Sequence, residues 1–138
     1  MSHSPKELVA HMMEKDCFSQ WMGVEVLEVE LGHCKIQMKV KKEMLNGFGI
    51  LHGGVSFAMA DSALAFASNS HGRLSVALSN SISYPNPSVE GDIIVAEAVE
   101  LTLGYKTATY DITLTHQEDK TIALIRGTVY RTSKPVIE

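Results

Sequence analysis

The sequence predicts an α+β fold in which an antiparallel β-sheet of five to six strands wraps around one long central helix. A stretch of small and apolar residues within 48–72 carries one charged side chain, so it predicts a buried helix. Segments before and after it alternate apolar and polar residues, as strands with one wet face do. Short turns join most of these segments and favour antiparallel pairing. We expect one domain, 1–138.

Composition excludes several classes of protein. With 45% hydrophobic and 20% charged residues, the chain is neither disordered nor collagen-like. A formal net charge of -4 is a poor sign for nucleic-acid binding, although a local basic patch could still hold an anionic ligand. The charged N-terminus does not resemble a signal peptide, and no run of about 18 apolar residues predicts a membrane span. The expected location is therefore the cytoplasm.

The thiol and imidazole side chains do not form a metal-binding pattern. Cys17 and Cys34 have no metal or redox spacing, and we expect both to be reduced. The six histidines form no HxxH or HExxH pair. The sequence therefore predicts no metal site.

The N-terminal segment predicts a helix at about residues 4–16. Ser4, Pro5 and Glu7 match an N-cap, a first-turn proline and a capping-box acid. An apolar cluster follows, and we expect it to pack at one end of the sheet: Phe18, Trp21 and Met22.

Six segments are predicted as strands, at residues 24–31, 34–41, 74–84, 93–103, 107–114 and 121–131. Residues 34–41 show the clearest alternation, with lysine or glutamine at every second position. The third segment has one apolar face and one small, polar face, the latter made by Ser75, Ala77, Ser79, Ser81 and Ser83. Pro85 and Pro87 end it, because proline cannot donate a ladder hydrogen bond.

Asp61 is anomalous in the middle of the predicted central helix, which would be about 18 residues and roughly 27 Å long. Removing an ionised carboxylate from water costs several kcal/mol unless the group is paired. Two interpretations follow from position alone. Asp61 either caps a loop or reaches solvent at a subunit boundary, or it has a chemical task.

His52, Gly53 and Gly54 lie at the start of this helix. The first N–H groups of a helix have no intrahelical acceptor, and the helix dipole places partial positive charge there. Two glycines allow a tight turn and a close approach of substrate to the backbone, at Gly54 as well as Gly53. The triplet is compatible with an oxyanion site and equally with an ordinary helix entry.

Taken together, the motifs resemble those of the hot-dog-fold thioesterases, most nearly the PaaI type of phenylacetic acid degradation. The motifs are Met44-Leu45-Asn46-Gly47, His52-Gly53-Gly54, Ala60-Asp61, Phe66-Ala67-Ser68-Asn69-Ser70, Ile82-Ser83-Tyr84-x-x-Pro87, Tyr110-Asp111-Ile112 and the run from Lys120 to Gly127. They cover nearly the whole chain. The order of predicted elements agrees with this resemblance independently.

The resemblance implies a shared active site in a homo-oligomer. Two subunits are expected to pair edge to edge into one sheet, with tetramers formed as dimers of dimers. The family acid falls on Asp61, and the backbone N–H that polarises the thioester carbonyl falls on Gly53. The loop asparagine falls on Asn46, and the histidine before the glycines is His52. Asn46, His52 and Gly53 are expected from one subunit, with Asp61 from the other.

Substrate-binding residues are less well defined by the resemblance. Some relatives place a Ser or Thr near the acid, where this chain has Ala77. Ser79, which we expect on the same strand face, is a candidate substitute, although a small space-filling residue explains it as well. Lys106, Arg126 and Arg131 are candidates for holding the nucleotide of coenzyme A.

The expected activity is hydrolysis of an acyl-CoA thioester, with an aryl acyl group such as phenylacetyl or hydroxyphenylacetyl. Asp61 would act as general base or as nucleophile. The substrate brings its own coenzyme A, so no cofactor is expected. Two alternatives share the fold: an enoyl-CoA hydratase or dehydratase, and a non-catalytic acyl-CoA sensor. Fold alone does not decide between them.

Overall fold

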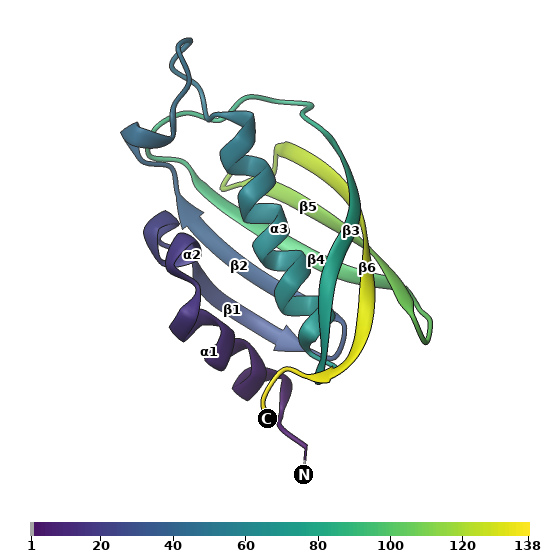
Figure 1. Cartoon of the computed structure of the whole chain (residues 1–138). Helices are drawn as coiled ribbons and strands as arrows, with labels where there is room; N and C mark the ends of the chain where they lie inside the picture. Colours follow the sequence, from purple (N-terminus) through teal and green to yellow (C-terminus); the bar gives the residue numbers. More distant parts are fainter. Residues whose placement is uncertain (1) are drawn as a thin grey trace.

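The computed structural model describes residues 2–138 and has the predicted arrangement of one sheet around one helix (Figure 1). The elements are α1 (Pro5–Lys15), α2 (Cys17–Met22), β1 (Glu25–Glu30), β2 (His33–Lys39), the 3-10 turn η1 (Lys42–Met44), α3 (Gly53–Asn69), β3 (Arg73–Ser83), β4 (Ile93–Leu103), β5 (Thr107–His116) and β6 (Thr121–Pro135). Within this described part of the chain, no helix is long and apolar enough to cross a membrane.

The six strands form one antiparallel sheet in the order β1-β2-β4-β5-β6-β3. The sheet curves around α3, and α1 and α2 lie beside β1 and β2 on the same side of the sheet as α3 (Figure 1). Although β3 follows α3 directly in sequence, it pairs with β6 and forms an edge of the sheet. An edge strand leaves one row of backbone donors and acceptors unpaired.

The core lies between the concave face of the sheet and α3. Alternate residues of β2 are buried, as the sequence pattern predicts, with Cys34, Ile36 and Met38 at most 1% exposed. Burial without a charged neighbour raises the pKa of the Cys34 thiol to about 12, so this thiol stays protonated. On α3, Met59 and Phe66 are fully buried.

In the N-terminal region the predicted helix cap is confirmed, but the predicted packing of the apolar cluster is not. Ser4 and Glu7 form the expected capping box of α1. The cluster that follows is a short helix, and its rings do not pack into the fold: Phe18 and Trp21 stack on each other at 5.8 Å and are 52% and 46% exposed. Met22 alone of the three is buried. The prediction was wrong for the two aromatic residues because a two-turn helix turns only one side inward.

Gly127 sets how closely α3 approaches the sheet. A Cβ atom at this position of β6 would lie 2.9 Å from Leu64 Cδ2 and even closer to Asn80 Oδ1. A Cβ here would therefore force the ends of the Leu64 and Asn80 side chains to move within a closely packed region, although the backbone is ordinary extended strand.

We predict that Gly127→Ala destabilises the fold by about 1–3 kcal/mol, the usual cost of overpacking a core. Denaturant unfolding of the variant and of the wild-type protein measures this change in the free energy of unfolding. Gly47→Ala is the matched control, because nothing lies within 4 Å of a Cβ at that position. Equal stabilities of the two variants would contradict this account of the packing.

Candidate active site

The start of α3 presents a free backbone amide. His52 is the N-cap, and its Nδ1 accepts a hydrogen bond of 2.8 Å from the Gly54 N–H. An accepting Nδ1 places the proton of the neutral ring on Nε2, so the ring offers a donor and not a base. Within residues 2–138 the structure records no acceptor for the Gly53 N–H. This amide can therefore receive an oxygen atom with partial negative charge.

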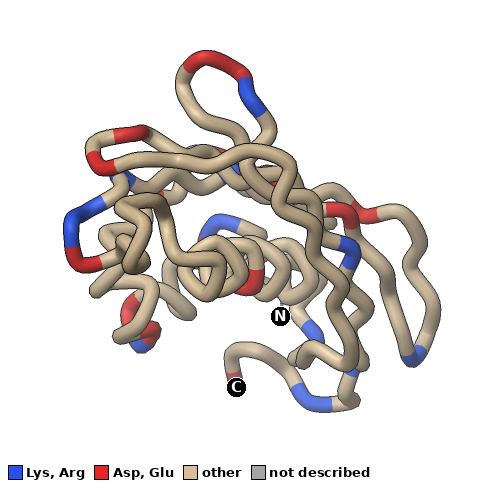
Figure 2. The backbone as a smooth tube through the Cα atoms, turned by 90° about the horizontal axis from the view of Figure 1, so that it is seen from above, with Lys and Arg blue, Asp and Glu red and all other residues tan. Residues whose placement is uncertain are grey.

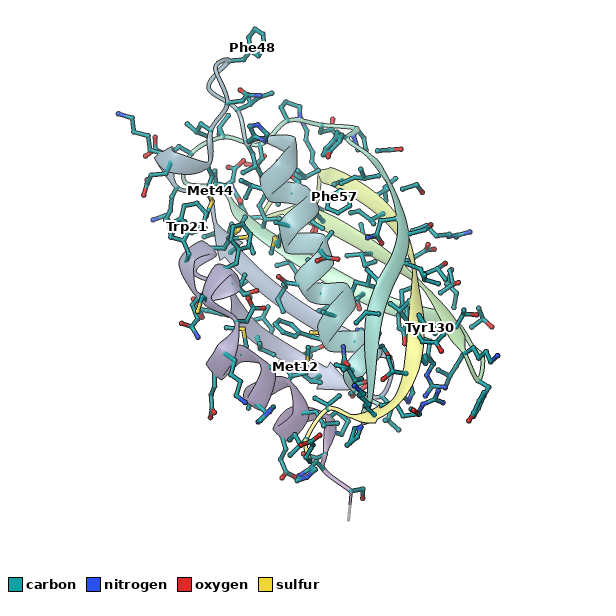
Figure 3. All side chains as sticks on the ribbon, viewed as in Figure 1. Met12, Trp21, Met44, Phe48, Phe57 and Tyr130 are labelled. Atoms are coloured by element: carbon teal, nitrogen blue, oxygen red, sulfur yellow. The ribbon has the colours of Figure 1, made fainter. Side chains whose placement is uncertain are left out.

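A structured loop leads into this helix end. Asn46 Oδ1 accepts from the N–H groups of Phe48 and Ile50, at 2.9 and 3.3 Å. The Asn46 N–H donates to the Ile50 carbonyl at 2.8 Å. Figure 3 shows Phe48 projecting from the loop tip, and it is 91% exposed. Asn46 thus holds the loop with its oxygen, while these bonds leave its NH₂ group unused.

An apolar pocket of about 480 Å³ opens beside the Gly53 amide. Its walls come from the loop, the start of α3, the segment after β3 and β6: Asn46, Ile50, Leu51, Gly53, Ser56, Tyr84, Pro85, Asn86, Pro87, Ser88 and Ile122. The size is in the range of small-molecule sites. The structure therefore brings Asn46 and Gly53 together at one pocket.

Asp61 lies apart from that pocket in a single chain. Eight residues separate it from Gly53, which is about 12 Å along the helix axis. Figure 2 shows that the tube of α3 is mostly tan and so carries little charge, and Asp61 is the acidic residue in the sequence of this helix. Its side chain is exposed and lines a smaller hollow of about 220 Å³ together with Ser75 and Ala77 of β3. One copy of the chain does not unite the acid with the amide.

The surroundings of Asp61 raise its pKa. Partial removal from water is the main cause, and the charge of Asp16 adds to it. Asp16 is held in place because its carboxylate accepts from the N–H and hydroxyl of Ser19, at 2.9 and 2.6 Å. Ser19 in turn shares a hydrogen bond of 2.8 Å with Ser62, the residue after Asp61. Sequence reasoning missed Asp16, although Asp followed by Ser three residues later is an N-cap pattern.

A β-bulge moves Ser79 to the opposite face of β3. Ala77 pairs with Val129, whereas Ser79 pairs with Thr128, the adjacent residue on β6. Adjacent strand residues point to opposite faces, so Ser79 does not share the face of Ala77. The expectation that Ser79 supports Asp61 was wrong, because simple alternation does not reveal an extra residue in a strand.

The three candidate cations occupy different environments. Arg126 forms a two-pronged pair with Asp111 at 2.8 and 3.0 Å, and this pair holds the pKa of the Asp111 carboxyl below its usual range. Arg131 donates to the Gly104 carbonyl at 2.7 Å. Lys106 is exposed in the turn between β4 and β5. Of the three, Lys106 is the most available to an anion.

Comparison with known proteins assigns the chain to a family. Residues 48–123 match the model of the thioesterase superfamily. The chain belongs to the thioesterase superfamily. As a member of this superfamily it is a thioester hydrolase. It is 36% identical over 131 residues to the acyl-coenzyme A thioesterase PaaI of Escherichia coli, with 95% of this chain and 94% of the relative covered. A protein of Archaeoglobus fulgidus is 44% identical over 124 residues, 90% of this chain and 80% of the relative.

Solved structures of superfamily members confirm the hot-dog fold. The PaaI protein of the Escherichia coli phenylacetic acid degradation operon matches with a TM-score of 0.94 at 34% identity, covering 97% of each chain. A variant of PaaI from Thermus thermophilus matches with a TM-score of 0.82 at 38% identity, covering 85% of this chain and all of that one. The predicted resemblance to PaaI-type thioesterases is confirmed.

We predict that Asp61→Asn raises the melting temperature at pH 7. A carboxyl whose pKa is raised in the folded state lowers stability as pH rises from its ordinary pKa through the raised one, and the ionised group carries this penalty. The gain should disappear at acidic pH, where Asp61 is protonated in both states. Asp111→Asn should show the opposite sign at pH 7, because Arg126 lowers the pKa of Asp111. A lower melting temperature for Asp61→Asn at pH 7 would contradict this account.

Proposed function

We propose that this thioester hydrolase acts on acyl-CoA thioesters with an aryl acyl group, such as phenylacetyl- or hydroxyphenylacetyl-CoA. The observation that carries the proposal is the unpaired N–H of Gly53, a residue that lines an apolar pocket of about 480 Å³. A pocket of this size and apolar character suits an aryl group. The similarity to PaaI of a phenylacetic acid degradation operon supports this substrate class.

Two copies of the chain would form each active site. The start of β3 lies beside Asp61, and the residue after its end, Tyr84, contacts Gly53. Antiparallel pairing of two β3 edges would bring the start of one strand to the end of the other. Asp61 would then face the partner's Gly53 pocket, which the distance of about 12 Å within one helix prevents in a single chain.

The outer face of the sheet supports a further association of dimers. Several of its apolar side chains are exposed by 41–60% in the isolated chain, namely Val76 and Leu78 of β3, Val99 and Leu101 of β4, and Leu124 and Tyr130 of β6. Figure 3 shows Tyr130 on this side. Polar residues of β5, such as Thr109 and Asp111, lie between these apolar side chains. Exposed apolar side chains in this number favour burial against another protein surface. A tetramer of two dimers is the assembly we propose.

In the proposed reaction the Gly53 N–H donates to the thioester carbonyl oxygen. Charge develops on this oxygen in the transition state, and loss of a comparable oxyanion donor costs about 3–4 kcal/mol elsewhere. His52 and Gly54 keep the helix start in place through the cap hydrogen bond. The NH₂ of Asn46 and the Nε2–H of His52 are further donors for the substrate.

In the proposed reaction Asp61 acts as a general base or as a nucleophile. As a general base, it takes a proton from water while the water oxygen attacks the acyl carbon, the C–S bond breaks, and the thiolate of coenzyme A takes a proton. As a nucleophile, it attacks directly, and water then hydrolyses the anhydride. A raised pKa favours the first role because it makes the carboxylate a stronger base. Neither route uses a metal or an organic cofactor, and Lys106 is the proposed contact for the nucleotide phosphates.

We predict that Asp61→Ala lowers kcat on the preferred aryl-CoA by about a hundredfold or more, the usual contribution of a general base. A hydrolysis panel of aryl, short-chain and long-chain acyl-CoAs measures it, with Asp111→Ala as control. Near-normal turnover of Asp61→Ala would reject the role of the acid.

Enoyl-CoA hydration, or tight acyl-CoA binding without hydrolysis, would point to the hydratase or sensor alternative. Heavy oxygen from water appearing in Asp61 after one turnover would identify the nucleophilic route.

We predict that two inactive variants complement each other when their subunits are exchanged. Asp61→Ala and Gly53→Val would each damage both sites of a homodimer. A hybrid dimer would carry one site with Asp61 and Gly53 both intact, so random reassociation should restore about a quarter of wild-type activity. The control mixes Asp61→Ala with Asp61→Asn. Absence of recovery in stable hybrids would reject the shared site.

A further inference from the structure

Tyr84 makes direct contact with the residue that carries the free amide. Its hydroxyl donates a hydrogen bond of 3.1 Å to the Gly53 carbonyl. Its ring packs against the Gly53 Cα, since a Cβ at Gly53 would lie 3.1 Å from Cζ, 3.2 Å from the hydroxyl oxygen and 3.3 Å from Cε1. Both residues line the apolar pocket.

The segment that carries Tyr84 is fixed on both sides. Ser83 forms the final β3 pair, with Leu124 of β6. After Pro85, the Asn86 side-chain amide donates to the Thr121 carbonyl at 2.8 Å. The Leu51 N–H donates to the Ser88 carbonyl, also at 2.8 Å, which ties this segment to the loop before α3. Tyr84 is therefore held by the sheet and by the loop, not by α3 alone.

The peptide group between Gly53 and Gly54 is bound at both of its polar atoms. Tyr84 donates to its oxygen, and its N–H donates to His52 Nδ1. A carbonyl oxygen has two lone pairs, so the bond from Tyr84 is compatible with the helical hydrogen bond. A peptide group restrained at both ends fixes the direction of the neighbouring Gly53 N–H. Electrostatic catalysis depends on this kind of preorganised donor.

We propose that Tyr84 is a positioning residue for the Gly53 amide and the reason why position 53 is glycine. The inference rests on the proposed thioesterase function. Gly53 does not have a positive φ, unlike Gly49 or Gly72, so backbone strain does not demand glycine there. The reason is space: a Cβ at position 53 would push against the Tyr84 ring, which would have to shift by a few tenths of an ångström and would strain its hydrogen bond to the helix start.

The first test is Tyr84→Phe, which removes the hydroxyl and keeps the ring. We expect kcat to fall about two- to tenfold, the value of one hydrogen bond, with KM unchanged because the pocket wall remains. Tyr105→Phe is the control, since Tyr105 is 77% exposed and lies in the turn between β4 and β5. Wild-type kcat in Tyr84→Phe would overturn the inference, and so would a rise in KM alone, which would indicate a substrate contact.

The second test is a double-mutant cycle of Gly53→Ala and Tyr84→Ala. If Gly53→Ala acts by displacing the tyrosine, it should lower kcat in the wild-type background and cost little more in the Tyr84→Ala background. Additive losses would overturn the inference.

Amide hydrogen exchange separates this inference from the proposed function. Peptides that cover residues 52–57 should exchange faster in Tyr84→Phe than in Tyr105→Phe, whether or not the enzyme turns over the chosen thioester. Failure of the wild-type protein to hydrolyse any acyl-CoA would remove the proposed function, while the exchange rates would still decide the positioning role. Equal exchange in the two variants would reject that role.

Discussion

The structure depends on one constraint: α3 must be thin enough to lie inside a curved sheet and must still present one ionisable side chain. Alanines and the absent side chain at Gly127 satisfy the first demand. The second is met at Asp61, which lines a hollow together with Ser75 and Ala77 of β3. Partial desolvation there raises the pKa of the carboxyl, so the geometry that lowers stability also makes Asp61 a stronger base for its proposed role.

The helix also keeps apart the two residues that the proposed reaction needs, Gly53 at its start and Asp61 in its middle. A rigid rod cannot bring its own start to a residue about 12 Å along its axis. The proposed site therefore needs a second copy of the chain, and the unpaired β3 edge is where we propose that this copy adds, since pairing there would not disturb the core. Oligomer formation in this fold is thus a requirement of the proposed reaction, in addition to any stability that burial of apolar surface supplies.

Sequence patterns predicted the features that depend on the order of residues within a single helix or strand. The central helix, the capping box at Ser4 and Glu7, and the six strands follow from local periodicity. The order of the strands and the bulge before Ser79 depend on pairing between distant segments, which alternation does not encode. The effect of Asp16 on Asp61 and the contact of Tyr84, which the sequence offered only as part of a motif, were not predicted for the same reason, because each acts on α3 from a different part of the chain.

Tyr84 shows why a short motif at a helix start is not a sufficient description of an oxyanion site. His-Gly-Gly supplies an amide with no internal acceptor, but two glycines in succession give that amide unusual conformational freedom. In this structure His52 restrains one end of the Gly53–Gly54 peptide and Tyr84 restrains the other. The glycines that let a substrate approach closely are therefore held by two aromatic side chains, and the order of the site comes from outside the motif. A relative that kept the glycines and lost the tyrosine would need another donor or a stiffer loop to hold the same amide.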